Sequence, residues 1–211
     1  VASEVEATVN QVLLKFGGKP IGRLPQLFEA DASFVSTLAI LDPYRAVRKR
    51  RADGPLPPVL PDPATGQGSG VFAYLSPGVA VPDHLVETLS QLGPELAVYA
   101  PALSDGQKAA LASAGCDCLQ RPLDIARDLK SFALAMHYGV GGTSSMALLA
   151  GVPQLALSLD IEKDLNGRAL QDAGCGKLIM LHRAGTKVEA RLIREMAGDA
   201  HLGAHAREVA R

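Results

Sequence analysis

The chain has few cysteines, almost no net charge and no long apolar run, and each shortage excludes a class of protein. Its three cysteines cannot all pair with one another, and they lack the spacing of a zinc site, so we expect reduced, buried thiols and no metal. The formal net charge of −1 lacks the basic excess that is typical of nucleic-acid binders. No apolar run approaches the ~18 residues of a membrane-spanning helix. We therefore expect a cytoplasmic protein without a nucleic-acid partner.

What is present suits a packed domain. A hydrophobic fraction of 47% over 211 residues is ample for one large core, with room for an appendage. The first residue is Val1 rather than Met, and no basic region followed by an apolar core resembles a secretory leader. We expect the chain to begin inside a longer protein.

The first forty residues predict separate local elements. Ser3 and Glu6 have the spacing of a capping box at a helix start, and Gly17-Gly18 suits its end. A short helical piece over 24–29 and a strand over 33–38 follow. We expect residues 1–41 to be a remnant of another domain, whose exposed apolar side chains favour a homodimer of the fragment; the contributors are Val9, Leu13, Phe28 and Phe34.

Residues 42–70 have the composition of an interdomain linker. A basic cluster over 45–51 is followed by prolines at 55, 57, 58, 61 and 63 and glycines at 66, 68 and 70. The cluster has two interpretations that the sequence leaves open. It is either a solvated stretch of linker or a contact with an anionic membrane surface, which would suit a lipid-linked ligand and a peripheral location.

From residue 71 to residue 211 the pattern becomes regular and predicts one domain. Short apolar strands are expected at 71–75, 95–100, 117–121, 132–137, 154–158 and 177–181. Helices are expected at 83–92, 105–114, 143–150, 161–173, 188–197 and 201–209. This alternation is typical of an α/β, Rossmann-like, doubly wound parallel sheet. In such a sheet the ligand site lies where the strand order reverses, so the loops 76–79 and 137–143 are the candidates.

The second of these loops has the residues of a diphosphate site. Gly139, Gly141 and Gly142 allow a sharp turn and a close approach by a ligand. The helix expected from Thr143 offers free N–H groups and the positive end of its dipole. Candidate side-chain donors to a phosphate oxygen are the strand-end His137 and the hydroxyls of Thr143, Ser144 and Ser145.

Other phosphate-binding loops do not fit. The first strand ends in Ser76-Pro77-Gly78, so the glycine-rich dinucleotide motif is absent, and so is the Gly-Lys-Ser/Thr of a Walker A loop. A plain glycine turn beside a core histidine stays open as the alternative.

The next strand–helix junction adds polar groups. If Asp160 caps a helix, Glu162 and Asn166 lie one turn apart on one face, with Lys163 beside them. A carboxylate at this strand end could accept hydrogen bonds from sugar hydroxyls. The alternative is a charged first turn with no ligand.

Taken together, these landmarks resemble a known family. The pattern His137-x-Gly139-x-Gly141, then 150–154, then Glu162-x₃-Asn166 and Gly174-x-Gly176, resembles the donor-binding domain of GT-B glycosyltransferases of the UDP-glucosyl/glucuronosyl and macrolide type. The match is specific over roughly forty residues. Segment 31–47 and the linker resemble that family's crossover from acceptor domain to donor domain.

The resemblance implies roles for individual residues. His137 would contact the donor phosphate; Glu162 would bind sugar hydroxyls, with Asn166 on the same helix; and Ser76 would lie on the nucleotide side. Gly139, Gly141, Thr143 and Ser144 would belong to the diphosphate loop.

Three positions depart from the family. Gly142 stands where Ser or Thr is usual, Lys163 where Gln is frequent, and Leu123 where a base-contacting Gln is common.

The implied function is the donor-binding part of an inverting hexosyltransferase. It would take a UDP- or dTDP-sugar as cosubstrate, need no cofactor, and use a small molecule or a lipid as acceptor. The family's general base lies in the missing N-terminal domain, so this fragment alone should be inactive. Two other functions stay open: a non-catalytic GT-B-like interaction or regulatory subunit, and a sugar-nucleotide epimerase.

Overall fold

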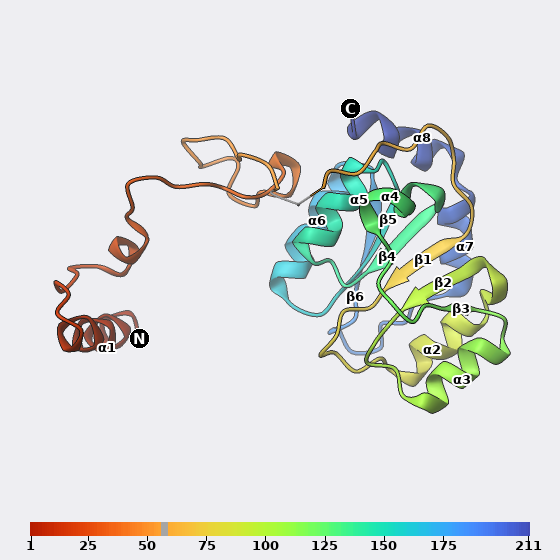
Figure 1. The fold of residues 1–211 in the computed structure, drawn as a ribbon, viewed down its shortest axis with the longest axis horizontal. Helices are drawn as coiled ribbons and strands as arrows, with labels where there is room; N and C mark the ends of the chain where they lie inside the picture. Colours follow the sequence, from red (N-terminus) through yellow and green to blue (C-terminus); the bar gives the residue numbers. More distant parts are fainter. Residues whose placement is uncertain (56–58) are drawn as a thin grey trace. The chain divides into compact units, whose positions relative to one another are not determined.

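A computed structural model describes residues 1–55 and 59–211 (Figure 1). The chain forms two compact units, Val1–Phe34 and Val35–Arg211. The second unit contains the sheet and all the predicted ligand-binding residues.

The sheet has six strands, all parallel, in the order β3-β2-β1-β4-β5-β6. The strands are β1 (Val71–Tyr74), β2 (Leu96–Tyr99), β3 (Asp117–Cys118), β4 (Leu134–His137), β5 (Gln154–Ser158) and β6 (Gly176–Met180). This confirms the predicted doubly wound sheet, and it places the reversal of strand order between β1 and β4.

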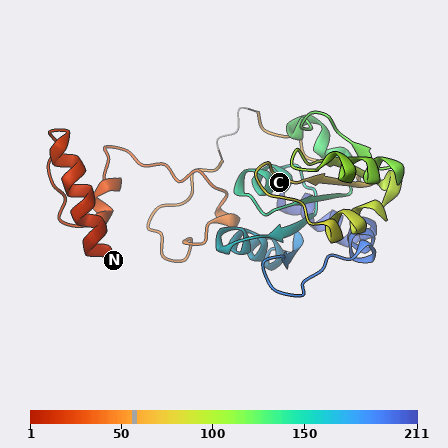
Figure 2. The same ribbon diagram turned by 90° about the horizontal axis from the view of Figure 1, so that it is seen from below.

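Helices cover both faces of the sheet (Figure 2). The core on one face contains side chains of α2, α3 and α7, whereas the other face packs against the segment around α4, α5 and α6. The helices of this unit are α2 (Asp83–Ser90), α3 (Asp105–Ser113), α4 (Ile125–Asp128), α5 (Gly141–Leu149), α6 (Ile161–Asp172), α7 (Ala190–Gly198) and α8 (Ala200–Val209).

Burial on both faces explains why most positions of the central strands are apolar. Val71 and Ala73 of β1 belong to the core under α2, whereas Phe72 between them belongs to the core on the opposite face. Successive side chains of a strand point to opposite faces, so a strand covered on both sides buries a polar side chain at either face. Two buried exceptions, His137 of β4 and Gln154 of β5, hydrogen-bond to each other.

Two predicted strands differ from the structure. Residues 33–38 form no strand, because their backbone bonds to a nearby loop: Val35 N donates to Asp53 Oδ2 at 2.8 Å, and Asp53 N donates to Val35 O at 2.9 Å. The strand expected over 117–121 ends at Cys118.

The first unit consists of α1 (Ala2–Lys15) and a 3₁₀ helix, Leu24–Phe28. The prediction of a capping box formed by Ser3 and Glu6 was wrong, because α1 begins before Ser3. Glu6 Oε1 instead accepts a hydrogen bond from Leu24 N at 3.1 Å. The predicted helix stop is confirmed, with Gly17 at φ 74°. Phe28 and Phe34 are 83% and 72% exposed, whereas the expected Val9 and Leu13 are half-buried. Self-association through this surface stays a prediction.

The junction between the predicted remnant, 1–41, and the predicted linker, 42–70, packs against the sheet domain. Leu41 and Asp42 are 3% and 4% exposed, and Leu41 shares an apolar cluster with Leu148 of α5 and Leu170 of α6. The boundary between a domain remnant that ends at residue 41 and a linker that begins at residue 42 stays a prediction. Pro57 and Pro58 of the predicted linker lie outside the described residues.

The β5–β6 pair depends on a glycine. Gly176 is paired in register with Gln154, and a Cβ at position 176 would lie 2.2 Å from Gln154 O. We expect Gly176→Ala to lower the free energy of unfolding by about 2 kcal/mol, as overpacking does. Chemical denaturation would measure this. Gly198→Ala is the matched control, because a Cβ there meets nothing within 4 Å; an equal loss in both variants would contradict the prediction.

Candidate functional site: the β4–α5 loop and its cavity

The loop between β4 and α5 lies at the reversal of strand order, as expected. Helix α5 starts at Gly141, two residues earlier than Thr143, and Val140 is its N-cap without a side-chain cap. Within the described residues, the N–H groups of Gly141, Gly142 and Thr143 donate no hydrogen bond. Such N–H groups, together with the helix dipole, favour an anion.

The shape of the loop requires glycine at position 139. Gly139 has φ 76°, and a Cβ there would lie 3.0 Å from Lys163 O and 3.3 Å from Lys163 Cβ. Its carbonyl accepts a hydrogen bond from Asn166 Nδ2 at 2.9 Å. The loop and the first turns of α6 are therefore in direct contact.

His137 supports the loop from inside the protein. Its side chain is buried, Nδ1 accepts a hydrogen bond from Gly139 N at 2.9 Å, and Nε2 lies 2.9 Å from Gln154 Oε1. Because Nδ1 is an acceptor, the ring proton is on Nε2 and is donated to Gln154. Gln154 Nε2 in turn donates to Ser144 O at 3.3 Å. The expectation that the His137 ring donates to a phosphate oxygen is not met in this arrangement, because both ring nitrogens are already engaged.

The loop hydroxyls separate into two groups. Ser145 borders a cavity, whereas Ser144 is fully buried and its Oγ has no hydrogen-bond partner among the described residues. Thr143 is half-buried and does not line the cavity. Of the three predicted hydroxyl donors, Ser145 is therefore the one placed to reach a ligand there.

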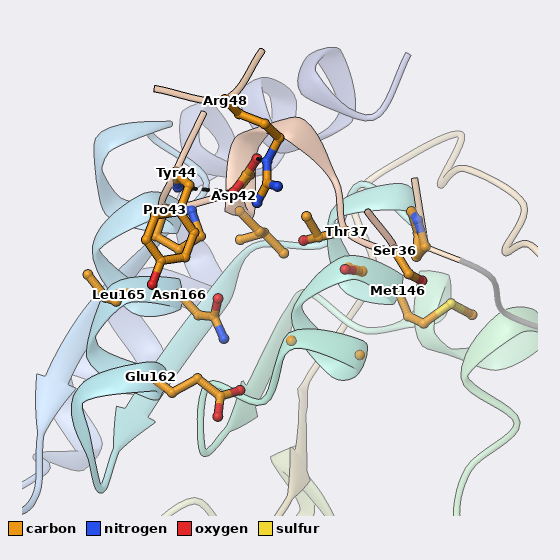
Figure 3. A pocket seen from close by; sticks show the side chains of 15 residues that line it. Ser36, Thr37, Asp42, Pro43, Tyr44, Arg48, Met146, Glu162, Leu165 and Asn166 are labelled. Atoms are coloured by element: carbon orange, nitrogen blue, oxygen red, sulfur yellow. Dashed lines mark hydrogen bonds and ion pairs between the residues drawn. The ribbon is translucent and has the colours of Figure 1, made fainter. Parts of the chain in front are cut away.

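A cavity of about 600 Å³ lies beside the start of α5 (Figure 3). It brings together five of the predicted residues with a segment that the sequence analysis did not assign to the site. The predicted residues that line it are Gly141, Gly142, Ser145, Glu162 and Asn166. The others are Met146, Leu165 and, from the segment that precedes the sheet, Ser36, Thr37, Leu41, Asp42, Pro43, Tyr44, Arg48 and Pro55.

The remaining predicted residues lie around this cavity without lining it. Ser76 is half-buried beyond the carboxyl end of β1. Asp160 caps α6 as expected, accepting a hydrogen bond from Lys163 N at 3.1 Å, and it also pairs with Lys163 Nζ. Lys163 is thereby held at the helix start, beside Glu162 but outside the cavity lining.

A polar cluster at the start of α6 was missed by the sequence analysis. Ser158 Oγ donates to Asp164 Oδ1, and His182 Nε2 lies 3.1 Å from each carboxylate oxygen of Asp164. Burial opposes ionisation of Asp164, but the hydrogen bonds from Ser158 and His182 outweigh it and lower the pKa of that carboxyl. The cluster joins the ends of β5 and β6 to the helix that carries Glu162.

Among the described residues, no group of three or more His, Cys, Asp or Glu side chains could hold a metal ion. In the same part of the chain, no helix is both long and apolar enough to cross a membrane.

The comparisons with known proteins give structural matches only. No family description and no curated protein matches the sequence. The glycotransferase of kitacinnamycin superposes with a TM-score of 0.70 at 18% identity, over 99% of this chain and 57% of that one. LpCGTa in complex with UDP matches with a TM-score of 0.60 at 18% identity, over 86% and 50%. Spinosyn rhamnosyltransferase SpnG complexed with thymidine diphosphate matches with a TM-score of 0.56 at 18% identity, over 83% and 50%.

The chain has the fold of about half of a GT-B glycosyltransferase. It spans between 50% and 57% of the length of these three structures. At such low identity the likeness establishes the fold and leaves the chemistry to the residues of the site.

The buried His137 predicts a pH-dependent stability. Burial lowers its pKa from the ordinary 6.5 to about 4, against the opposing effect of the Gln154 hydrogen bond. The unfolded chain therefore binds more protons between these values, and stability is lost as the pH falls from 6.5 to 4, by roughly 3 kcal/mol. Denaturation at a series of pH values would measure this.

Two variants isolate the contribution of His137. His137→Asn keeps an acceptor near the Nδ1 position but does not titrate, so the slope over this pH range should largely disappear. His201→Asn, at an exposed histidine, should retain it. Equal slopes in both variants would show that another group is responsible.

Proposed function

We propose that this chain is the donor-binding part of a glycosyltransferase and that it holds a nucleotide diphosphate sugar at the first turn of α5. One observation carries the proposal: Gly141 and Gly142, whose N–H groups have no partner among the described residues, line the same cavity as Glu162. The glycosyltransferase fold supports the proposal but is not sufficient for it.

The diphosphate half of the proposal rests on backbone geometry. A helix start contributes up to ~2 kcal/mol to the binding of an anion. Each hydrogen bond to a charged group adds ~1.5–3 kcal/mol. The turn at Gly139 leads into α5, whose first N–H groups have no partner among the described residues, and Ser145 adds a hydroxyl one turn later. In this proposal His137 positions the loop and does not touch the phosphate.

The sugar half rests on α6. Glu162 is exposed and lines the cavity, so its carboxylate can accept hydrogen bonds from sugar hydroxyls. Asn166 lines the same cavity while its amide holds the Gly139 carbonyl. Sugar binding and diphosphate binding are therefore coupled through Asn166.

The nucleotide, the acceptor and the chemical step belong to the proposal as well. LpCGTa with UDP and SpnG with thymidine diphosphate support UDP or dTDP as the carrier. Ser76, which follows β1, would contact the nucleotide. Transfer would invert the anomeric centre in one displacement. A second domain would provide the general base and would bind the acceptor, a small molecule or a lipid. This chain alone would bind donor without transferring sugar.

Calorimetric titration with UDP, dTDP and GDP tests the diphosphate site. We expect UDP or dTDP to bind, and Gly141→Val to weaken that binding at least tenfold, or about 1.4 kcal/mol. The reason is that a Cβ at position 141 points at Asn166 Nδ2, 3.7 Å away, so the valine methyls would narrow the cavity. Gly198→Val, at the far end of α7, is the control. If none of the three nucleotides binds at millimolar concentration, even with an upstream domain restored, a non-catalytic GT-B-like subunit becomes the better proposal.

Glu162 should contribute to binding of the sugar and not of the nucleotide. UDP-glucose should bind the unaltered chain more tightly than UDP does, and we expect Glu162→Gln to reduce this difference, because an amide accepts fewer hydrogen bonds from hydroxyls than a carboxylate. The affinity for UDP itself should change by less than twofold. Glu87→Gln, at an exposed position of α2, should change neither affinity. If Glu162→Gln weakens the binding of UDP and of UDP-glucose equally, Glu162 does not bind the sugar part of the donor.

A further inference from the structure

An ion pair lies across the cavity from Glu162 (Figure 3). Asp42 is 4% exposed, and its carboxylate receives Arg48 Nε at 2.6 Å and Arg48 Nη2 at 3.1 Å. Tyr44 N donates to the same carboxylate at 3.0 Å. The hydrogen bond from Arg48 holds the pKa of Asp42 below its ordinary value, so the pair is charged at neutral pH.

The pair leaves one edge of the guanidinium unused. Arg48 has five N–H donors, of which Asp42 takes one at Nε and one at Nη2. Across the described residues Arg48 makes no other hydrogen bond, so Nη1 and the second hydrogen of Nη2 form a free fork. The guanidinium also lies 5.9 Å from the centre of the Tyr44 ring, a cation–π contact that restrains its plane.

Directed N–H donors, and not net charge, provide for an oxyanion at this fork. The charged residues that line the cavity are Asp42, Arg48 and Glu162; Asp42 and Arg48 neutralise each other, so Glu162 leaves the lining with a formal charge of −1. Gly141 and Gly142, whose N–H groups have no partner among the described residues, line the same cavity. An anion there would therefore meet a guanidinium edge as well as a helix start, in a cavity whose volume is ordinary for a small-molecule site.

We propose that Arg48 is an anion-binding residue of this cavity, whose outer guanidinium edge holds one phosphate of a diphosphate ligand while Asp42 fixes the inner edge. A guanidinium fork matches the oxygens of a phosphate in a bidentate contact. Asp42 acts as a positioning residue, because a fork that is already oriented loses less side-chain freedom when the ligand binds. The nucleotide part of the ligand rests on the proposed function; the anion part does not.

The test is titration of the whole 211-residue chain with inorganic pyrophosphate, UDP and uridine. Removing Arg48 alone would leave a buried, unpaired Asp42, so the main variant is Asp42→Asn with Arg48→Gln, which replaces the ion pair by two amides. Arg48→Lys keeps the charge but loses the fork. Lys49→Gln is the control, since it removes one positive charge from an exposed neighbour that does not line the cavity. Circular dichroism and thermal unfolding would confirm that each variant is folded.

We expect the double variant to bind pyrophosphate and UDP at least tenfold more weakly, and Arg48→Lys to show a smaller loss. The affinity of Lys49→Gln for pyrophosphate and UDP should stay within twofold of that of the unaltered chain. The affinity for uridine should be the same in all variants. The inference is overturned if the double variant binds pyrophosphate like the unaltered chain, if Lys49→Gln loses as much, or if the unaltered chain binds no pyrophosphate. If pyrophosphate binding depends on Arg48 but UDP binds no better than pyrophosphate, the anion site stands and the proposed nucleotide site fails.

Discussion

The backbone of residues 138–140 turns out of a buried parallel strand directly into a helix, so neither element supplies all its hydrogen-bond partners. Side chains supply them instead: His137 accepts from Gly139 N, and Asn166 donates to Gly139 O. Gln154 extends this support from His137 to Ser144 O. The first N–H groups of α5 are free because no preceding helical turn supplies their acceptors, and this network fixes the loop that leads into them.

The same network joins two helices into one site. Gly139 packs against Lys163, so the start of α6 cannot move away from the β4–α5 loop without opening a gap. Ser158, Asp164 and His182 fix the helix from its other side. Glu162, one turn before Asn166, is thereby presented to the cavity by a rigid element, as a binding residue requires.

Much of this arrangement was predictable from local patterns. Parallel β strands and the switch point follow from apolar strands alternating with helices, and Gly139 and Asp160 follow from loop and cap chemistry. The role of His137 was not predictable, because a strand-end histidine can face a ligand or the core with equal ease. The Gln154 amide beneath it, seventeen positions away, decides between these orientations. The expected strand over 33–38 did not form, since the backbone of Val35 bonds to Asp53 and, among the described residues, the sheet contains no strand from this segment.

The sequence by itself determined the order of strands and helices, the glycine loop and the position of the acidic residue on α6. These depend on periodicity and on backbone requirements within a few residues. Only the tertiary structure decided that the segment with Asp42, Tyr44 and Arg48 lines the same cavity. That segment has the composition of a linker, and it is held in place by burial of Leu41 against α5 and α6, more than one hundred positions later in the chain. Contacts over such separations leave no local pattern, because they depend on surfaces that exist only after the sheet has formed.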